Sequence, residues 1–161
     1  MLISTTDASD YPKFKDYLYN RFPNIVASKT IVKNLLKYGN LSESAVRAAL
    51  YPGMPPLLKV VPIGTEEGVF SSDLGKLERN QPGIIKLSTR MVSGFNEGPW
   101  YQENFFPNNK GQDVPVVGGV LLHFLCHWGN FITGRSEGGV EMGDEFEVAT
   151  YGHHVYYYPS S

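Results

Sequence analysis

Residues 113–128 constrain the fold of this chain more than any other stretch, because most of them are apolar and only Asp113 is charged. Asp113 suits a helix cap and Pro115 suits a first helical turn, so we expect a helix that runs to about Trp128. A helix that is apolar on every side is buried. Gly118 and Gly119 each cost about 1 kcal/mol of helix propensity, which predicts that another element approaches the helix closely at this point.

The same helix carries two histidines, His123 and His127, at positions i and i+4. These positions lie on one helix face, from which two imidazoles can bind one metal ion. A single core histidine is usually hydrogen-bonded, but two in one buried helix must each satisfy two ring nitrogens away from water. Glu141 follows His127 by 14 residues, beyond a Gly-rich turn, and is the candidate third ligand. Spacing alone leaves two interpretations open, a metal site and a pair of structural histidines.

Length and composition exclude several classes of protein. A chain of 161 residues with 42% hydrophobic and 19% charged residues suits one globular domain. The net charge of −2, without a Lys/Arg cluster, argues against a nucleic-acid partner. We expect no membrane span, and residues 1–10 lack the pattern of a Sec signal peptide.

Cys126 is the only cysteine, so the chain cannot form an internal disulfide. Its position within the apolar helix predicts a buried core thiol. A cysteine hydrolase that uses Cys126 with a histidine is a minor alternative, because a nucleophilic thiol needs partial exposure and a nearby positive charge.

The rest of the chain predicts an α+β fold in a single domain, residues 1–161. Its helical N-terminal part spans residues 1–51 and its core spans residues 57–158. Capping residues, apolar periodicity and Pro or Gly stops predict the elements. The expected helices are 10–22, 29–39, 43–50, 89–95 and 141–151. The expected strands are 57–61 and 84–87, with a weaker one near 69–70. Gly129 and Gly134 are expected to end the helix that carries the two histidines.

Three pieces of sequence together resemble a known family. They are Ile-Ile-Lys-Leu-Ser at 84–88, Leu-Leu-His-x-x-x-His-Trp-Gly-Asn at 121–130, and Glu-x-Gly-Asp-x-Phe-Glu-x-x-x-Tyr-Gly at 141–152. They resemble the metallopeptidase toxin domains of bacterial polymorphic and type VI secretion effectors, zincin-like domains with a His-Glu-Leu-x-His-Trp-Gly core. The resemblance covers roughly residues 84–152, matches the first 80 residues only loosely, and implies a zincin-like fold with a buried active-site helix.

The resemblance also implies roles for individual residues. His123 and His127 correspond to the zinc ligands, and Glu141 lies in the segment that supplies the third ligand. The identity of that third ligand stays open among four acidic residues, Glu141, Asp144, Glu145 and Glu147. Tyr151 and His153 are weaker candidates, as groups that orient the ligands or stabilise an oxyanion, and core packing is the plainer interpretation of Tyr151.

Phe124 departs from the family pattern at the position of the catalytic glutamate. In such a peptidase this position holds the general base, roughly 60° around the helix axis from His127 at 100° per residue. A phenyl ring cannot accept a proton. Three explanations follow: an inactivated form, natural or engineered; a pseudoenzyme that keeps the metal or the fold for binding; or a substitute base such as Glu137 or Glu145. The first two are favoured over the third.

The expected function is that of a zinc metallopeptidase-like antibacterial toxin, inactive or weakened by Phe124. Its substrate would be protein or cell-wall peptide of a rival cell, bound extended beside a sheet edge. Its partner would be a cognate immunity protein. It would reside in the producer's cytoplasm and be delivered by a contact-dependent system. The alternative is a non-catalytic protein-interaction domain with structural histidines.

Overall fold

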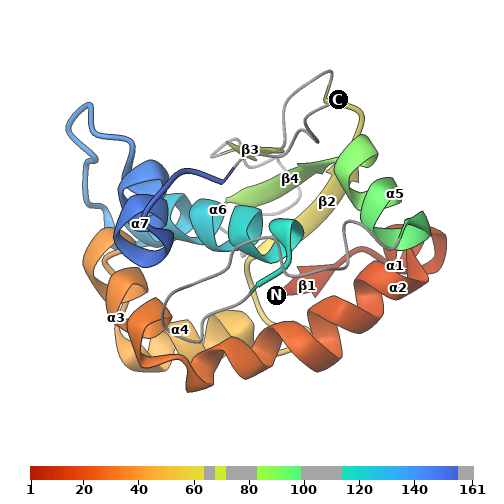
Figure 1. The fold of residues 1–161 in the computed structure, drawn as a ribbon, viewed down its shortest axis with the longest axis horizontal. Helices are drawn as coiled ribbons and strands as arrows, with labels where there is room; N and C mark the ends of the chain where they lie inside the picture. The colour runs from red at the N-terminus through yellow and green to blue at the C-terminus, as the bar shows by residue number, and fades with distance from the viewer. Residues whose placement is uncertain (64–67, 72–82, 99–113, 156–161) are drawn as a thin grey trace.

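The computed structural model describes residues 1–63, 68–71, 83–98 and 114–155, which combine helices with a small sheet (Figure 1). This confirms the predicted α+β class. Within the described residues the sheet has four strands in the order β1-β2-β4-β3. The strands are β1 (Leu2–Ile3), β2 (Leu57–Val61), β3 (Gly68–Ser71) and β4 (Ile84–Ser88).

Three strands of this sheet are parallel and one edge strand is antiparallel. β2 pairs with β1 and with β4 in parallel, with Leu58 opposite Ile85. β3 pairs antiparallel with β4, with Gly68 opposite Leu87. Both long strands are rich in Ile, Leu and Val, which pack well on a pleated surface. The sequence did not predict β1, because two residues are too short to show a strand period.

The N-terminal part is more broken than the single helix expected over residues 10–22. Ser4 caps a helix that begins at Thr5, and its hydroxyl accepts the Asp7 N–H. Pro12 then opens a second helix, because its fixed φ suits the first helical turn. The segments are α1 (Thr5–Asp10), α2 (Pro12–Asp16), the π-helical η1 (Tyr17–Arg21) and the 3-10 helical η2 (Phe22–Ala27).

Two further N-terminal helices begin where their capping serines predict. Ser28 Oγ accepts the Ile31 N–H at the start of α3 (Lys29–Tyr38). Ser42 Oγ accepts the Ala45 N–H at the start of α4 (Glu43–Leu50). Ser88 likewise caps α5 (Thr89–Glu97) through the Arg90 N–H.

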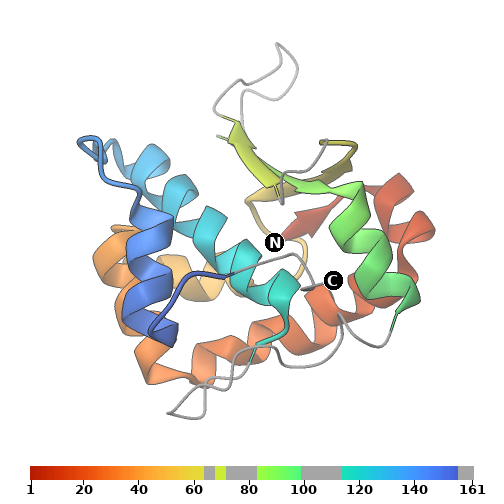
Figure 2. The ribbon, with the colours of Figure 1, turned by 45° about the horizontal axis from the view of Figure 1, so that its top comes forward.

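The predicted helix that carries the two histidines is α6 (Val116–Thr133), and it lies at the centre of the molecule (Figures 1 and 2). It packs against α7 (Met142–Tyr151) and also against β3 and β4. α6 is long and apolar enough to span a membrane, but 67% of it is buried inside the protein, as expected of a core helix. Asp113, the predicted cap, lies outside the described residues.

Close helix packing explains two glycines of α6. A Cβ at Gly118 would collide with the Tyr17 hydroxyl, so an element does approach closely there. A Cβ at Gly129 would collide with the Gly39 carbonyl. The prediction that Gly129 ends the helix was therefore wrong: its missing side chain serves packing, and the helix continues to Gly134, whose φ of 71° ends it.

A single cluster of buried side chains joins the N-terminal helices, the sheet and α6. Aromatic rings contribute much of it. Phe95 of α5 meets Phe14 of α2 edge-on at 6.2 Å and Tyr17 of η1 at 5.2 Å between ring centroids. The core therefore fixes α6 against the rest of the chain, which makes its histidine face a rigid platform.

Candidate metal centre

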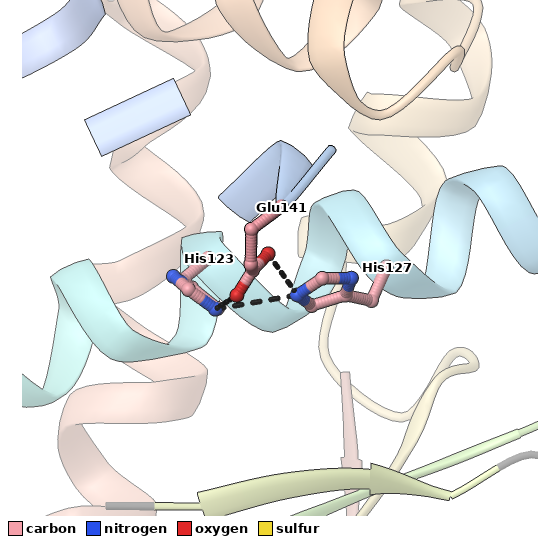
Figure 3. Close-up of side chains that lie close together, drawn as sticks. All are labelled: His123, His127 and Glu141. Carbon is pink, nitrogen blue, oxygen red and sulfur yellow. Dashed lines mark hydrogen bonds and ion pairs between the residues drawn. The ribbon is translucent and has the colours of Figure 1, made fainter. Parts of the chain in front are cut away.

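The two predicted histidines of α6 turn the same ring nitrogen toward each other (Figure 3). His123 Nε2 and His127 Nε2 lie 3.3 Å apart, and the ring centroids are 5.1 Å apart. Their side chains are 14% and 17% exposed, so both rings lie at the edge of the core. The i,i+4 spacing on a rigid helix thus produces the convergence that the sequence predicted.

Glu141 reaches the same point from the start of α7 (Figure 3). Its Oε1 lies 2.7 Å from His127 Nε2, and its Oε2 lies 3.2 Å from His123 Nε2. Glu141 is also the N-cap of α7, because its Oε1 accepts the Gly143 N–H at 2.9 Å. The Gly-rich turn after α6 therefore returns the chain so that the candidate third ligand meets both imidazoles.

On the other side of each imidazole ring, a carboxylate lies within hydrogen-bond distance of the Nδ1 atom. Glu147 Oε1 lies 2.8 Å from His123 Nδ1, and Glu137 Oε2 lies 2.8 Å from His127 Nδ1. An ionised carboxylate can only accept a hydrogen bond, so each Nδ1 carries the hydrogen of a neutral imidazole. Each Nε2 then presents its lone pair to the shared point.

Two imidazole lone pairs and the Glu141 carboxylate therefore face one another, and this cluster of acceptors requires a cation. The cation can be a proton or a metal ion. Burial lowers the pKa of His123, but the hydrogen bonds and charges of Glu141 and Glu147 outweigh it and raise the pKa to about 10. Burial also lowers the pKa of His127, but the hydrogen bonds of Glu141 and Glu137 outweigh this effect and raise the pKa above its ordinary value.

The donor chemistry fits a divalent metal ion. The atoms offered by His123, His127 and Glu141 all lie within 4.8 Å of one another. Two imidazoles and a carboxylate form a ligand set that leaves coordination positions open, as catalytic metal sites do. Burial raises the pKa of the Glu141 carboxyl, but its contacts with both histidines dominate and lower it, so Glu141 stays ionised and available as a ligand.

The remaining acidic candidates lie elsewhere on α7. Glu147 is 3% exposed and contacts the Nδ1 side of His123, as does Asp144, whose Oδ1 lies 3.8 Å from that nitrogen. His123, Asp144 and Glu147 thus form a second group of possible ligands, on the ring nitrogen that points away from His127. Glu145 is exposed and belongs to neither group among the described residues.

The Phe124 ring lies beside both histidines, on the side of α6 that faces β3. Its centroid is 4.9 Å from that of His123 and 6.0 Å from that of His127. A Cβ placed on Gly68 of β3 would lie 2.8 Å from Phe124 Cε2. The phenyl ring therefore fills the space between the helix and the edge strand, next to the point where the ligand atoms converge.

Two weaker candidates lie apart from the converging group. Tyr151 is 7% exposed and packs edge-on against Phe146, at 6.1 Å between centroids, and burial raises the pKa of its hydroxyl well above the usual value. This placement favours core packing. His153 is exposed, and its Nδ1 contacts the His154 carbonyl at 2.9 Å.

Cys126, on the same helix, is fully buried in the core, and burial raises the pKa of its thiol well above the usual value. Such a thiol stays protonated, which argues against the cysteine hydrolase alternative. The sequence predicts a long loop at 96–112, whose aromatic side chains either line a cleft or pin the loop to the core. These residues, Trp100, Tyr101, Phe105 and Phe106, lie outside the described residues.

Sequence reasoning missed two contributions to the site. Gly143 makes room for the His123 ring, since a Cβ there would lie 2.5 Å from His123 Nε2. A glycine in the first turn of a helix is a weak signal of such a close approach. The contact of Glu137 with His127 Nδ1 was also missed, because spacing cannot tell which ring nitrogen an acidic residue will meet.

Comparison with known protein families gives a match over most of the chain. The family model described as metallopeptidase toxin 3 matches residues 7–152, which is most of the chain and includes the N-terminal helices. No curated protein and no solved structure matches.

Proposed function

Because the chain belongs to the metallopeptidase toxin 3 family, we propose that it is a zinc-binding toxin domain of the peptidase type whose hydrolytic step is blocked or strongly weakened at Phe124. One observation carries the proposal. Three intact ligand side chains, His123, His127 and Glu141, converge beside an aromatic ring at the position where the family pattern has the general base.

The ligand half of the site supports zinc binding. His123 Nε2, His127 Nε2 and a Glu141 oxygen would hold the ion, with donor types that Zn²⁺ prefers. When bound, Zn²⁺ polarises a carbonyl and lowers the pKa of a coordinated water. The protein contributes by fixing the three donors on two packed helices, α6 and α7.

The catalytic half lacks a proton acceptor at Phe124. Loss of a general base typically costs a factor of about 10²–10⁴ in rate, and the Phe124 ring, which lies beside both histidines, would also crowd a water bound at the ligand atoms. Glu137 is a poor substitute because both of its oxygens are engaged, one with His127 Nδ1 and one with the Met142 N–H. Glu145 is exposed and belongs to neither ligand group among the described residues.

The arrangement of α6 under an edge strand supports a zincin-like architecture with a peptide substrate. β3 is an edge strand of the described sheet and packs against α6. An extended peptide can add to such an edge and lie across the histidines. Protein or cell-wall peptide of a rival cell is the proposed substrate class.

The toxin description of the family supports a biological setting of competition between bacteria. A producer of such a toxin needs a cognate immunity protein, which is the proposed macromolecular partner. We place the chain in the cytoplasm of the producer before a contact-dependent machine, such as a type VI system, delivers it.

Metal analysis of untagged protein tests the proposal. Wild-type protein should bind one equivalent of zinc, and the His123→Ala/His127→Ala double variant should bind none. Circular dichroism of both proteins separates loss of the site from loss of the fold. The proposal would be contradicted if wild-type protein, incubated with excess zinc, bound no zinc at any pH from 6.5 to 10.

A second candidate is a non-catalytic interaction domain with structural histidines. The observation in its favour is that Glu137, Glu141 and Glu147 give all four ring nitrogens a carboxylate partner without a metal. This candidate predicts a zinc-free protein whose stability falls in the double variant, because the buried Glu147 carboxylate would lose its imidazole partner.

A further inference from the structure

We infer that Glu137 and Glu147 are positioning residues, which hold the two histidines in the tautomer and direction that metal binding needs. The inference rests on the proposed function, since it gives the zinc site a layer of residues behind its ligands. It assigns these acidic residues a role that differs from those of third ligand and substitute base. Each of the two carboxylates uses both of its oxygens in hydrogen bonds.

Glu147 is locked into the core behind His123. Its side chain is 4% exposed, and Oε1 lies 2.8 Å from His123 Nδ1. Oε2 accepts the Val155 N–H at 2.8 Å. Val155 is buried and follows Gly152, whose φ of 84° turns the chain back after α7. The segment after α7 therefore holds the carboxylate so that it cannot rotate away from the imidazole.

Glu137 serves His127 in the same manner from the Gly-rich turn. Oε2 lies 2.8 Å from His127 Nδ1, and Oε1 accepts the N–H of Met142, the first residue of α7, at 3.1 Å. In both pairs one oxygen faces the ring and the other holds a backbone N–H. The two pairs differ in rigidity, since Glu137 is 26% exposed in a turn and Glu147 lies in the core.

The geometry favours positioning over direct coordination. Both carboxylates meet Nδ1, whereas the ligand atoms converge on Nε2. A carboxylate that accepts Nδ1–H fixes the tautomer with a free Nε2 lone pair and raises the basicity of that nitrogen. A second metal held by His123 Nδ1, Asp144 and Glu147 is the competing assignment. Glu147 is satisfied without this second metal, because His123 Nδ1 and the Val155 N–H already form hydrogen bonds to its two oxygens.

Glutamine substitutions test the assignment because they keep the shape and remove one acceptor. An amide oxygen can accept the Nδ1–H, but its NH₂ group then faces a backbone N–H, donor against donor. We expect Glu147→Gln and Glu137→Gln each to weaken zinc affinity by roughly 10–100-fold, with one equivalent still bound at saturation. Affinity is measured by competition with a chromogenic chelator. Glu145→Gln, on the exposed side of α7, makes the same charge change and should bind zinc as the wild type does.

A second readout reports the tautomer directly. Long-range ¹H–¹⁵N correlation spectra of the zinc-loaded wild type should show Nδ1 protonated in both His123 and His127. The two glutamine variants should show the affected ring with a changed Nδ1 shift. If Glu147→Gln does not fold, Glu137→Gln alone decides the matter, because its carboxylate lies in a partly exposed turn.

Three outcomes overturn the inference. Unchanged affinity and unchanged Nδ1 shifts in both variants would leave the carboxylates without a positioning role. A second zinc equivalent in the wild type that disappears in Glu147→Gln would make Glu147 a ligand. Wild-type protein without zinc would overturn the proposed function as well, so the two failures are distinguishable.

Discussion

The two sides of α6 around the histidines differ in chemistry. Toward α7, carboxylates surround His123 and His127, and three of them, Glu137, Glu141 and Glu147, have a hydrogen-bond partner. Toward β3, the Phe124 ring closes the space with an apolar surface. The contrast teaches that binding a metal ion and transferring a proton are separate demands on the same helix: the α7 side offers ligand atoms, and the β3 side presents a ring that cannot accept a proton.

The fold tolerates this division because the two sides face different environments. On the α7 side, loss of the His123 ring would leave the buried Glu147 carboxylate without its imidazole partner and would destabilise the protein. Phe124 is half-buried and packs against the core. Because its side chain is apolar, it needs no hydrogen-bond partner in the folded protein. An apolar side chain at this position therefore has little structural cost.

The largest expected effect comes from Phe124→Glu, which would give the apolar side the chemistry it lacks. This change should raise metal-dependent peptide hydrolysis or toxicity by about 10²–10⁴-fold, the usual contribution of a general base. The measurement is cleavage of a mixed peptide library, or growth of cells that express the variant, with and without a chelator. Phe124→Gln opens the same space without a base and should stay near wild-type activity. A soluble, zinc-loaded Phe124→Glu protein that is inert in both assays would contradict an enzyme ancestry with this geometry.

The next effect concerns the pH dependence of the α7 side. In metal-free protein the folded-state pKa of His123 is about 10, above the ordinary value of 6.5, so its stabilising contribution is complete below pH 6.5 and is lost as the pH rises toward 10. The pKa of Glu141 is lowered from 4.5, so its contribution to the same contact is lost as the pH falls below 4.5. Urea unfolding should therefore show the contact at full strength between pH 4.5 and 6.5, with a loss on the order of a few kcal/mol toward pH 10.

Bound zinc should abolish the loss of stability between pH 6.5 and 10, because the ion replaces the proton between the imidazoles and the carboxylate. Apparent zinc affinity should accordingly rise with pH over the same range. If the free energy of unfolding of the metal-free protein stayed constant from pH 6.5 to 10, protonated His123 would not be stabilising the fold through its contacts with Glu141 and Glu147.

The smallest expected effect is that of Gly143→Ala, which tests how closely α7 approaches His123. A methyl group there would lie 2.5 Å from His123 Nε2, so the ring or the helix has to shift. Overpacking of this kind costs about 1–3 kcal/mol, and the displaced ring should also weaken zinc binding. Thermal unfolding and chelator competition measure the two effects. Val148→Ala, at an exposed position of the same helix, should change neither. Equal zinc affinity in Gly143→Ala and wild type would mean that the ring has freedom to move.

The sequence predicted those parts of the fold that local rules determine. Ser28, Ser42 and Ser88 began helices where their capping side chains indicated. The strands predicted at 57–61 and 84–87 from their apolar composition correspond to β2 and β4. The convergence of the histidines and Glu141 followed from the helical period and from one Gly-rich turn.

Other features depend on tertiary contacts and could not be predicted. β1 has only two residues and exists because β2 pairs with it. Gly129 resembled a helix stop, but Gly39 packs against it and the helix continues. The roles of Glu137 and Glu147 depend on the rotation of α7 against α6, which decides whether a carboxylate meets Nδ1 or Nε2.

X-ray absorption at the zinc edge, on wild-type protein loaded with one equivalent of zinc, tests the central claim most directly. The account predicts two imidazole nitrogens at about 2.0–2.1 Å and carboxylate oxygen at about 2.0–2.2 Å, with the imidazole signal lost in the His123→Ala/His127→Ala variant. A spectrum without imidazole scattering, or one that is the same in both proteins, would contradict a zinc site built by His123, His127 and Glu141.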